Sequence, residues 1–370
     1  MHKSYSANIF KNLLIWIPAI SLFVAFRSIG VINPQFEAEG PVLLVAMALS
    51  VGTMAGILFG IMETISDRYL MYRLPWGKLV LLGVIAFIAS FVILLLTGII
   101  VFLSLTDHVP SVRELGIDLI SANSLLLMIY LFLVGGIVDL FRIMDRKFGP
   151  GNLWRIMKGE YYSPREAIRI VMFLDMKSST SLAESLGHLR YSSLIKDCFD
   201  DLTVVVKYKA EIYQYVGDEA VLTWTLEHGL KDLNCIRAFD AFCSRLQQRR
   251  DYYQRHYNVV PTFKAGLNSG RVVITEVGQV KREIAYHGDT INTAARIQSL
   301  CNQLNANLLL SRSLKDILPA TRDYEFELTG EELLRGKTIQ VEIYKARIQK
   351  PEEENKEPQA STSPLHEKIT

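Results

Sequence analysis

The sequence predicts an α-helical membrane bundle of four transmembrane helices, followed by an α+β domain with ferredoxin-like βαββαβ order. Three observations bear on this prediction. The chain of 370 residues is 50% hydrophobic, and nearly all of the excess lies in its first 141 residues. The remainder alternates strand-like and helix-like patterns and ends in a polar tail. The formal net charge of +2 gives no indication of a nucleic-acid partner.

Four apolar runs in the first part are long enough to cross a bilayer, which takes about 20 apolar residues. A cleaved signal peptide explains the first run poorly, because the run is too long for the apolar region of such a peptide. Lys and Arg are concentrated before the first run, between the second and third, and after the fourth. Both ends of the chain are therefore expected in the cytoplasm. The runs are Leu13–Val31, Pro41–Met62, Leu79–Leu105 and Leu119–Val138.

Small residues repeat within the second run, where Gly52, Gly56 and Gly60 are spaced four apart. This spacing lets two helices approach closely, and we favour packing inside the bundle over a seam between two chains. Asp139 and Arg142 lie one helical turn apart at the end of the fourth run and are expected to pair.

A polar connector over residues 142–166 joins the bundle (residues 1–141) to the second domain. A short helix is expected at Asn152–Lys158, after the Gly149-Pro150-Gly151 break. The second domain is expected over residues 167–346. Residues 347–370 have the composition of a disordered tail. The four cysteines all follow the bundle, and their spacing matches no zinc site, so they are expected to be reduced thiols.

The elements of the second domain follow from apolar periodicity and from turn residues. The expected strands are Ile168–Leu174, a hairpin of Glu211–Val216 and Ala220–Thr225, a second hairpin of Thr262–Asn268 and Arg271–Val277 that turns at Ser269-Gly270, and a last strand Ile339–Tyr344. The expected helices are Ser179–Leu186, Tyr191–Lys209, Leu230–His256 and Asp289–Cys301.

Two aspartates each follow a strand-like run: Asp175 after the first strand, and Asp218 after a turn glycine in the first hairpin. Two carboxylates at neighbouring strand ends suit a hard divalent cation. Ser179 and Thr180 open the helix after Asp175, and a helix N-terminus attracts phosphate oxygens. The simpler alternative is that Asp175 only caps this helix and Asp218 only forms a turn.

A further polar pair lies on the expected helix of the HGDTINTAARIQ segment, where Asn292 and Arg296 share one face. An asparagine can position a ribose oxygen, and an arginine can stabilise the charge that develops on a phosphate. Arg271, and the basic turn of Arg335 and Lys337, could also reach phosphates. Taken alone, Asn292 and Arg296 are better explained as a solvent-facing polar stripe on a helix. Arg271 is about equally well explained as a surface arginine, and Arg335 and Lys337 as a solvated basic turn.

The blocks FLDMKSSTSLAE, YVGDEA, GLNSGRVV and HGDTINTAARI, in this order, resemble the catalytic domain of class III nucleotidyl cyclases, in particular bacterial membrane-anchored members. The resemblance covers about Ile168 to Tyr344. It implies conversion of ATP to 3′,5′-cyclic AMP and pyrophosphate by a lyase in the cell inner membrane. It also implies two Mg²⁺ or Mn²⁺ ions per site, bound by Asp175 and Asp218.

The same resemblance assigns the other positions. Asn292 and Arg296 match the family's catalytic pair, Arg271 a phosphate-binding arginine, and Arg335 or Lys337 the phosphate lysine. In this family one protomer supplies the aspartates and its partner supplies the asparagine and arginine. A homodimer with two sites is therefore expected.

The base-selecting positions depart from the family pattern, because they hold Gln214 and Ala285 instead of the usual Lys with Asp or Thr. A glutamine can donate to and accept from a purine edge, whereas an alanine can do neither. ATP is favoured as the commoner substrate of bacterial members. A guanylyl cyclase, and a catalytically silent membrane receptor that binds nucleotide, remain as alternatives.

Overall fold

The structure is a computed structural model, and it describes residues 2–30, 40–66, 76–105, 122–149, 152–332 and 340–349. The chain divides into two compact units, Met1–Met144 and Asp145–Thr370. The predicted basic turn of Arg335 and Lys337, and the tail beyond Gln349, lie outside the described residues.

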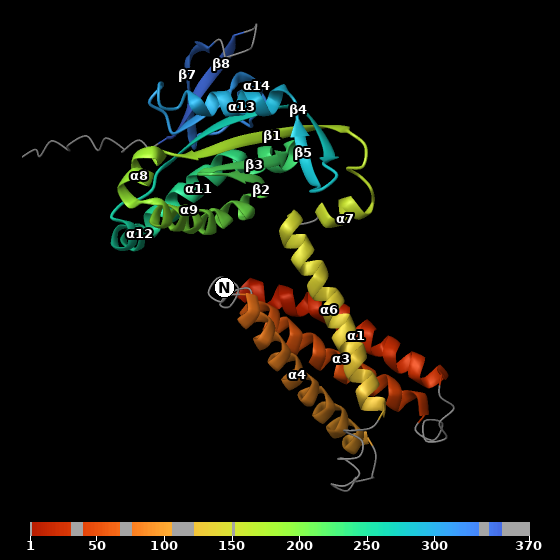
Figure 1. Cartoon of the computed structure of the whole chain (residues 1–370). Coiled ribbons are helices and arrows are strands. Elements are labelled where there is room, and N and C mark those ends of the chain that lie inside the picture. The colour runs from red at the N-terminus through yellow and green to blue at the C-terminus, as the bar shows by residue number, and fades with distance from the viewer. Residues whose placement is uncertain are drawn as a thin grey trace, which may run out of the picture. The chain divides into compact units, whose positions relative to one another are not determined.

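Four helices of the first unit are long and apolar enough to cross a membrane, which confirms the prediction of four spanning helices (Figure 1). Their membrane-length segments are Tyr5–Phe26, Leu44–Ile65, Leu81–Val101 and Leu125–Asp145. The chain therefore has the pattern of a multi-pass membrane protein. The helices are α1 (His2–Gly30), α3 (Gly40–Ile65), α4 (Trp76–Leu105) and α6 (Ala122–Phe148).

Helices α1 and α3 pack with almost no space between their backbones. A Cβ atom on Gly56 would lie 2.9 Å from the Cα of Leu13, and one on Gly60 would lie 2.8 Å from the Cα of Ile9. Gly52 meets α1 in the same way. Because each glycine faces α1 of its own chain, the prediction of packing within the bundle is confirmed.

The predicted contact between Asp139 and Arg142 is also present, with Oδ1 and NH1 3.1 Å apart. Asp139 is well exposed, whereas Arg142 is mostly buried and has a shorter contact, 2.8 Å, to Glu63 on α3. This second partner could not be predicted from local sequence, because Glu63 and Arg142 lie far apart in the chain.

The second unit is built on an eight-stranded sheet with the strand order β2-β3-β1-β4-β6-β8-β7, and β5 pairs with the far part of β4. Strands β2, β3, β1 and β4 are antiparallel, with helices between β1 and β2 and between β3 and β4. This confirms the predicted βαββαβ order. The strands are β1 (Arg165–Met176), β2 (Glu211–Val216), β3 (Glu219–Thr225), β4 (Phe263–Val277), β5 (Glu283–His287), β6 (Leu308–Ser311), β7 (Tyr324–Glu332) and β8 (Val341–Ile348).

Helices cover both faces of this sheet (Figure 1). Successive residues of β1 point to opposite faces, so Ile170 and Met172 join the main core beneath α9 and α11. Val171 packs with Ala294 of α13 on the other face. The helices are α7 (Asn152–Met157), α8 (Ser179–Leu186), α9 (His188–Leu202), α10 (Leu226–Leu230), α11 (Asn234–Gln248), α12 (Arg250–Tyr257), α13 (Asp289–Ser299) and α14 (Arg312–Lys315), with 3₁₀ turns η2 (Thr203–Tyr208) and η3 (Lys231–Leu233).

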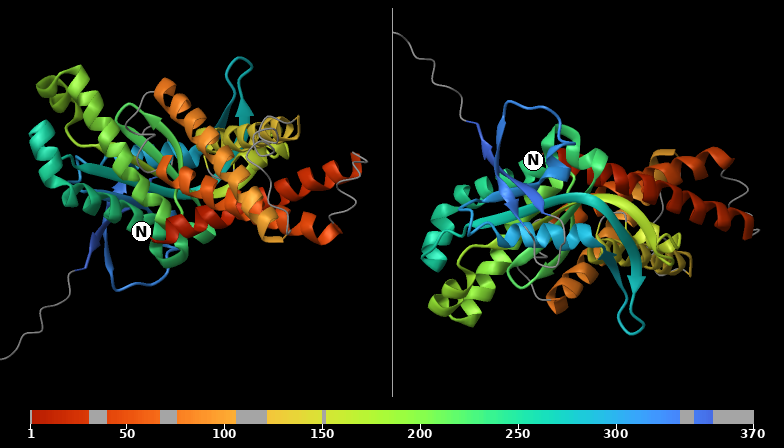
Figure 2. Two further views of the ribbon diagram at one scale, coloured as in Figure 1. Left: turned by 90° about the horizontal axis from the view of Figure 1, so that it is seen from below. Right: turned by 90° about the horizontal axis from the view of Figure 1, so that it is seen from above.

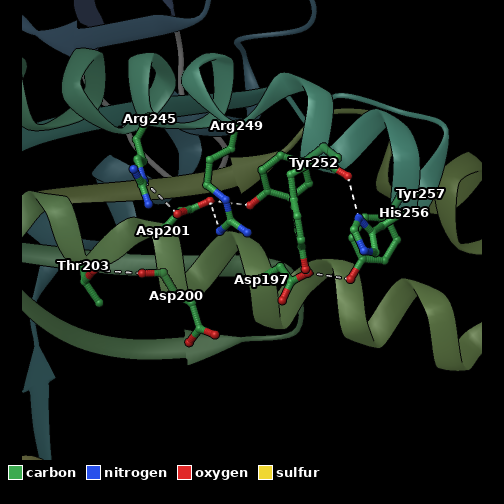
Figure 3. Close-up of polar contacts among 10 residues, drawn as sticks. Asp197, Asp200, Asp201, Thr203, Arg245, Arg249, Tyr252, His256 and Tyr257 are labelled. Carbon is green, nitrogen blue, oxygen red and sulfur yellow. Dashed lines mark hydrogen bonds and ion pairs between the residues drawn. The ribbon is translucent and has the colours of Figure 1, made fainter. Parts of the chain in front are cut away.

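A buried carboxylate fastens α9 to α11 and α12 (Figure 3). The side chain of Asp201 is 3% exposed and accepts hydrogen bonds from Arg245 at 2.9 Å, Arg249 at 2.8 Å and Tyr253 at 2.7 Å. Three donors satisfy the buried charge, so this group has a structural role. The helix predicted over Leu230–His256 is in fact divided at Arg249 into α11 and α12.

The predicted second hairpin at Ser269-Gly270 is wrong. Strand β4 runs through both residues, and its pairing with β1 continues without a break, Ile170 opposite Ser269 and Arg169 opposite Gly270. Figure 2 shows β4 as one long curved strand that ends in the β4–β5 hairpin. Gly270 is needed for close packing and not for a turn, because a Cβ there would lie 2.5 Å from Oγ1 of Thr290 on α13.

Two smaller expectations also differ from the structure. The helix predicted over Tyr191–Lys209 ends at Leu202 and continues as the 3₁₀ turn η2. The helix that Ser179 and Thr180 were expected to open does begin at Ser179, but Ser178 before it adopts a left-handed conformation and its side chain makes no capping hydrogen bond. All four cysteines are free thiols, as expected.

The close approach of α1 and α3 can be tested with one methyl group. We expect Gly56→Ala to destabilise the bundle by about 1–3 kcal/mol, because the new Cβ overlaps the Leu13 backbone. Thermal unfolding of the full chain in detergent would measure this. Gly136→Ala in α6 is the matched control, since nothing lies within 4 Å of its Cβ position. Equal effects of the two changes would contradict the packing described here.

Candidate metal and nucleotide site

Asp175 and Asp218 come together at one end of the sheet. In the pairing of β1 with β3, Asp175 lies opposite Glu219, the residue that follows Asp218. Directly opposed residues of antiparallel strands have Cβ atoms about 5 Å apart. The strand register, and not local sequence, therefore brings these acidic residues into one site.

Two donors hold one oxygen of the Asp175 carboxylate. The Nε2 of Gln298 on α13 lies 2.9 Å from Oδ2, and the Nζ of Lys264 on β4 lies 3.2 Å from the same atom. Both donors are mostly buried, with Gln298 6% and Lys264 8% exposed. Because both bind Oδ2, the carboxylate is fixed in orientation.

Sequence reasoning missed Lys264 and Gln298. The signal for Lys264 was a lone cation at the start of an apolar strand, and Gln298 was the last residue of the HGDTINTAARIQ segment. Their partner could be known only from packing. Gly266 on β4 allows α13 to pack closely enough for Gln298 to reach Asp175, because a Cβ at Gly266 would lie 2.2 Å from the backbone nitrogen of Gln298.

The negative charges of Asp175, Asp218 and Glu219 lie close enough to disfavour one another. Burial raises the pKa of Asp175, Lys264 lowers it, and the charge of Asp218 raises it. Burial, together with the charges of Asp175 and Asp218, raises the pKa of Glu219 to about 7. Carboxylates that are held together in this way attract a cation.

An unsatisfied atom indicates what the group is suited to bind. Oδ2 of Asp218 is buried and has no hydrogen-bond partner among the described residues. No cluster of three or more His, Cys, Asp or Glu side chains with metal-binding geometry occurs in the described ranges. Mg²⁺ is commonly bound through one or two carboxylates together with substrate phosphates, so this pair fits such an ion.

Helix α8 begins four residues after Asp175, with Ser179 half-buried and Thr180 exposed. The N–H of Leu182 bonds to the carbonyl oxygen of Ser178 at 3.0 Å, so the intrahelical ladder starts there. The backbone N–H groups of residues 179–181 have no such partner in the helix and are available to an anion.

Asn292 and Arg296 do not join Asp175 within the chain. Arg296 lies two residues before Gln298 on α13, a rotation of about 200°, and Asn292 is rotated by about 240°. Because Gln298 faces Asp175, the other two side chains project from the opposite side of the helix. Asn292 is exposed and Arg296 half-buried, and neither side chain makes a hydrogen bond or ion pair within the described part of the chain.

A cavity of about 600 Å³ lies beside the N-terminal half of α13. Its walls include Asp289 and Thr293 of α13, Glu331 near the end of β7, and Gln340 just before β8. Asn292 and Arg296 do not line this cavity, and Arg335 and Lys337 lie outside the described residues.

The remaining predicted residues lie at separate positions. Gln214 is exposed on β2, next to an irregularity in its pairing with β3, and Ala285 is half-buried on β5. Arg271 is 80% exposed and lies 3.6 Å from Glu166. It follows Lys264 by seven residues, or about 23 Å of strand, so Lys264 is the cation beside Asp175 in this chain.

A second cavity, of about 670 Å³, lies between η2, α11 and β7. Its acidic residues include Asp201, whose charge Arg245, Arg249 and Tyr253 already satisfy. Neither Asp175 nor Asp218 lines it. The paired carboxylates are therefore the better candidate for a functional centre.

Comparison with known sequences identifies the class. Residues 161–346 match the family described as the adenylate and guanylate cyclase catalytic domain. The chain belongs to this family, and its class III cyclase domain is preceded by four long apolar helices.

Individual relatives include both kinds of cyclase. The chain is 32% identical to "Adenylate cyclase 2" of Rhizobium meliloti (strain 1021) over 62% of its own length and 64% of that protein. The match therefore spans less than two thirds of the length of that relative. It is 26% identical to the receptor-type guanylate cyclase gcy-28 of Caenorhabditis elegans, over 46% of this chain and 13% of that protein.

A solved bacterial light-regulated adenylyl cyclase has the same fold, with a TM-score of 0.50 and 23% sequence identity. The match covers 64% of this chain and 66% of that structure.

The charge repulsion between Asp175 and Asp218 leads to a prediction about stability. We expect Asp218→Asn to stabilise the metal-free chain by about 1 kcal/mol, because it removes the negative charge that acts on Asp175. Thermal unfolding with a chelator present would measure this. Glu184→Gln, an exposed change on α8, serves as the control and should have little effect. A lower unfolding temperature for Asp218→Asn would show that the two carboxylates do not repel each other.

Proposed function

We propose that the chain is a membrane-anchored adenylyl cyclase, which converts ATP to 3′,5′-cyclic AMP and pyrophosphate at sites shared between two copies. The observation that carries the proposal is the pairing of Asp175 with Asp218, whose buried Oδ2 has no partner among the described residues. The family supplies the reaction class. The relative with the longer match, "Adenylate cyclase 2", supports ATP as the substrate.

Asp175 and Asp218 would hold Mg²⁺ or Mn²⁺, two ions per site. Bound there, the metal would stabilise negative charge on the attacking ribose oxygen and on the phosphates. Gln298 and Lys264 keep Asp175 in a fixed orientation, so its carboxylate needs no rearrangement to bind. The free amides of α8, with Ser179 and Thr180, would bind phosphate oxygens. Lys264, whose Nζ lies 3.2 Å from Oδ2 of Asp175, would be a further cation for the phosphates.

The partner chain would supply the remaining groups. In our proposal Asn292 positions the ribose, and Arg296 stabilises the charge that develops on the transferred phosphate. Arg271, and Arg335 or Lys337, would contribute to phosphate binding. The rotation between Gln298 and Arg296 on α13 supports this division, because one helix cannot direct both toward the same site. A two-fold dimer would complete two sites.

We further propose that both ends of the chain are cytoplasmic and that the helices lie in the cell inner membrane. The distribution of Lys and Arg between the apolar runs supports this orientation. ATP would then be available to the catalytic domain.

A guanylyl cyclase of the same fold is the second candidate. Two observations favour it: Gln214 and Ala285 differ from the usual adenylyl pattern, and guanylate cyclases are among the relatives. Gln214 can form hydrogen bonds to either purine, and Ala285 to neither.

Product analysis decides between these functions. We expect the purified full chain to form cyclic AMP from ATP with Mg²⁺ or Mn²⁺, and to form far less cyclic GMP from GTP. A preference for GTP would favour the second candidate. No product from either nucleotide would leave a silent nucleotide-binding receptor as the explanation.

The shared site has its own test. We expect Asp175→Ala, Asp218→Ala and Arg296→Ala each to lower turnover by about 10²-fold or more. Mixing Asp175→Ala chains with Arg296→Ala chains should restore about a quarter of normal activity, since half the dimers are mixed and each has one intact site. Asp175→Ala mixed with Asp218→Ala is the control, because both changes affect the same half and should give no recovery. Recovery in both mixtures, or in neither while mixed dimers form, would contradict the division.

A further inference from the structure

We propose that a buried polar cluster of Asn12, Glu63 and Arg142 fastens α6 to α1 and α3, and holds α6 in the alignment that the catalytic domain needs for turnover. This inference rests on the proposed function for its effect on activity. Its effect on the bundle is independent of that function. The three residues are called the Arg142 cluster below.

The contacts of the Arg142 cluster form a closed triangle between three helices. Arg142 NH2 lies 2.8 Å from Glu63 Oε2 and donates to Asn12 Oδ1 at 2.9 Å. Asn12 Nδ2 donates to the same Glu63 oxygen at 2.6 Å and to the backbone oxygen of Asn8 at 2.8 Å. Each member therefore contacts the other two.

The location makes this cluster unusual. Asn12, Glu63 and Arg142 all lie within membrane-length segments, and Asn12 is fully buried. The side chain of Glu63 is 7% exposed and that of Arg142 16%. Charged residues within such segments are costly, so they are kept where they pair and where function needs them. Arg142 Nε adds to the cost, because it is buried with no hydrogen-bond partner among the described residues.

Helix α6 depends on such polar contacts more than α3 does. Only 6% of the α6 segment is buried inside the bundle, against 33% of the α3 segment. A second polar contact joins α6 to α1, where the Tyr130 hydroxyl donates to the backbone oxygen of Ala19 at 2.8 Å. Tyr130 and Arg142 are twelve residues apart, about 18 Å along the helix. The polar contacts of Tyr130 and Arg142 therefore restrict both the rotation of α6 about its axis and its position along that axis.

The cluster lies on the helix that leads directly to the catalytic domain. Helix α6 continues to Phe148, α7 starts at Asn152, and β1 runs from Arg165 to the segment with Asp175. In this proposal a change in the position of α6 reaches the catalytic domain along the chain between Phe148 and Arg165. If α6 is released, fewer molecules hold the productive alignment, and kcat falls with the populated fraction.

Two carboxylates that bind the same arginine provide a matched test in the full chain in lipid nanodiscs. Glu63→Gln neutralises the buried partner of Arg142, and Asp139→Asn neutralises the exposed one. We expect Glu63→Gln to lower kcat about five-fold or more with little change in KM for ATP. Asp139→Asn should change kcat by less than about two-fold. The double variant Glu63→Arg with Arg142→Glu, which exchanges the two charges, should have a higher kcat than either of its single changes.

A second readout is independent of activity. Paired spin labels at Leu14 and Leu140, both exposed, would report the distance between α1 and α6. Cys243, the native thiol that is not fully buried, would be replaced by serine for this purpose. We expect a broader distance distribution in Glu63→Gln and an unchanged one in Asp139→Asn. Arg142→Lys, which keeps the charge but cannot bridge both partners, should resemble Glu63→Gln.

Equal effects of Glu63→Gln and Asp139→Asn, or an unchanged distance distribution in Glu63→Gln and Arg142→Lys, would overturn the proposal. A broader distribution without any fall in kcat would overturn its functional part. A wild-type chain without cyclase activity would contradict the proposed function instead, and the label distances would still decide whether the Arg142 cluster holds α6.

Discussion

Repulsion between Asp175 and Asp218 is the constraint that the rest of the catalytic domain must balance. The antiparallel register of β1 and β3 brings the two carboxylates together, and the fold then has to hold them there. Lys264 on β4 supplies the nearest positive charge, and Gln298 on α13 supplies a buried donor. Neither reaches Oδ2 of Asp218, which remains without a partner among the described residues. The domain thus keeps an electrostatically unfavourable pair of carboxylates, a common feature of functional sites.

Helix α13 links the two halves of the proposed catalytic centre. Its inner face packs on β4 at Gly266 and presents Gln298 to Asp175, while Asn292 and Arg296 project from the other side. In the proposed dimer, a shift of this helix would therefore disturb the carboxylates of one site and the partner groups of the other. Coupling between the two proposed sites would then require no additional element, because one helix would belong to both.

Much of this architecture could be predicted because it depends on short-range patterns. The four apolar runs, the βαββαβ order, and the positions of Asp175 and Asp218 after strands all follow from local sequence. Strand β4 could not be predicted, because Ser269-Gly270 has the composition of a turn and only contact with Thr290 explains the glycine. Lys264 and Glu63 were missed for a related reason. Their partners lie far away in the sequence, and only the folded chain brings them together.

In the proposed dimer, the membrane anchor would also change how two catalytic domains meet. Four spanning helices would confine each chain to a surface, so copies would search for one another in two dimensions. Such confinement raises the local concentration of partners without any new contact between them. A weak interface between catalytic domains is then sufficient for assembly. The number of chains per area of bilayer, and not their number per volume of cell, becomes the quantity that controls how many complete sites exist.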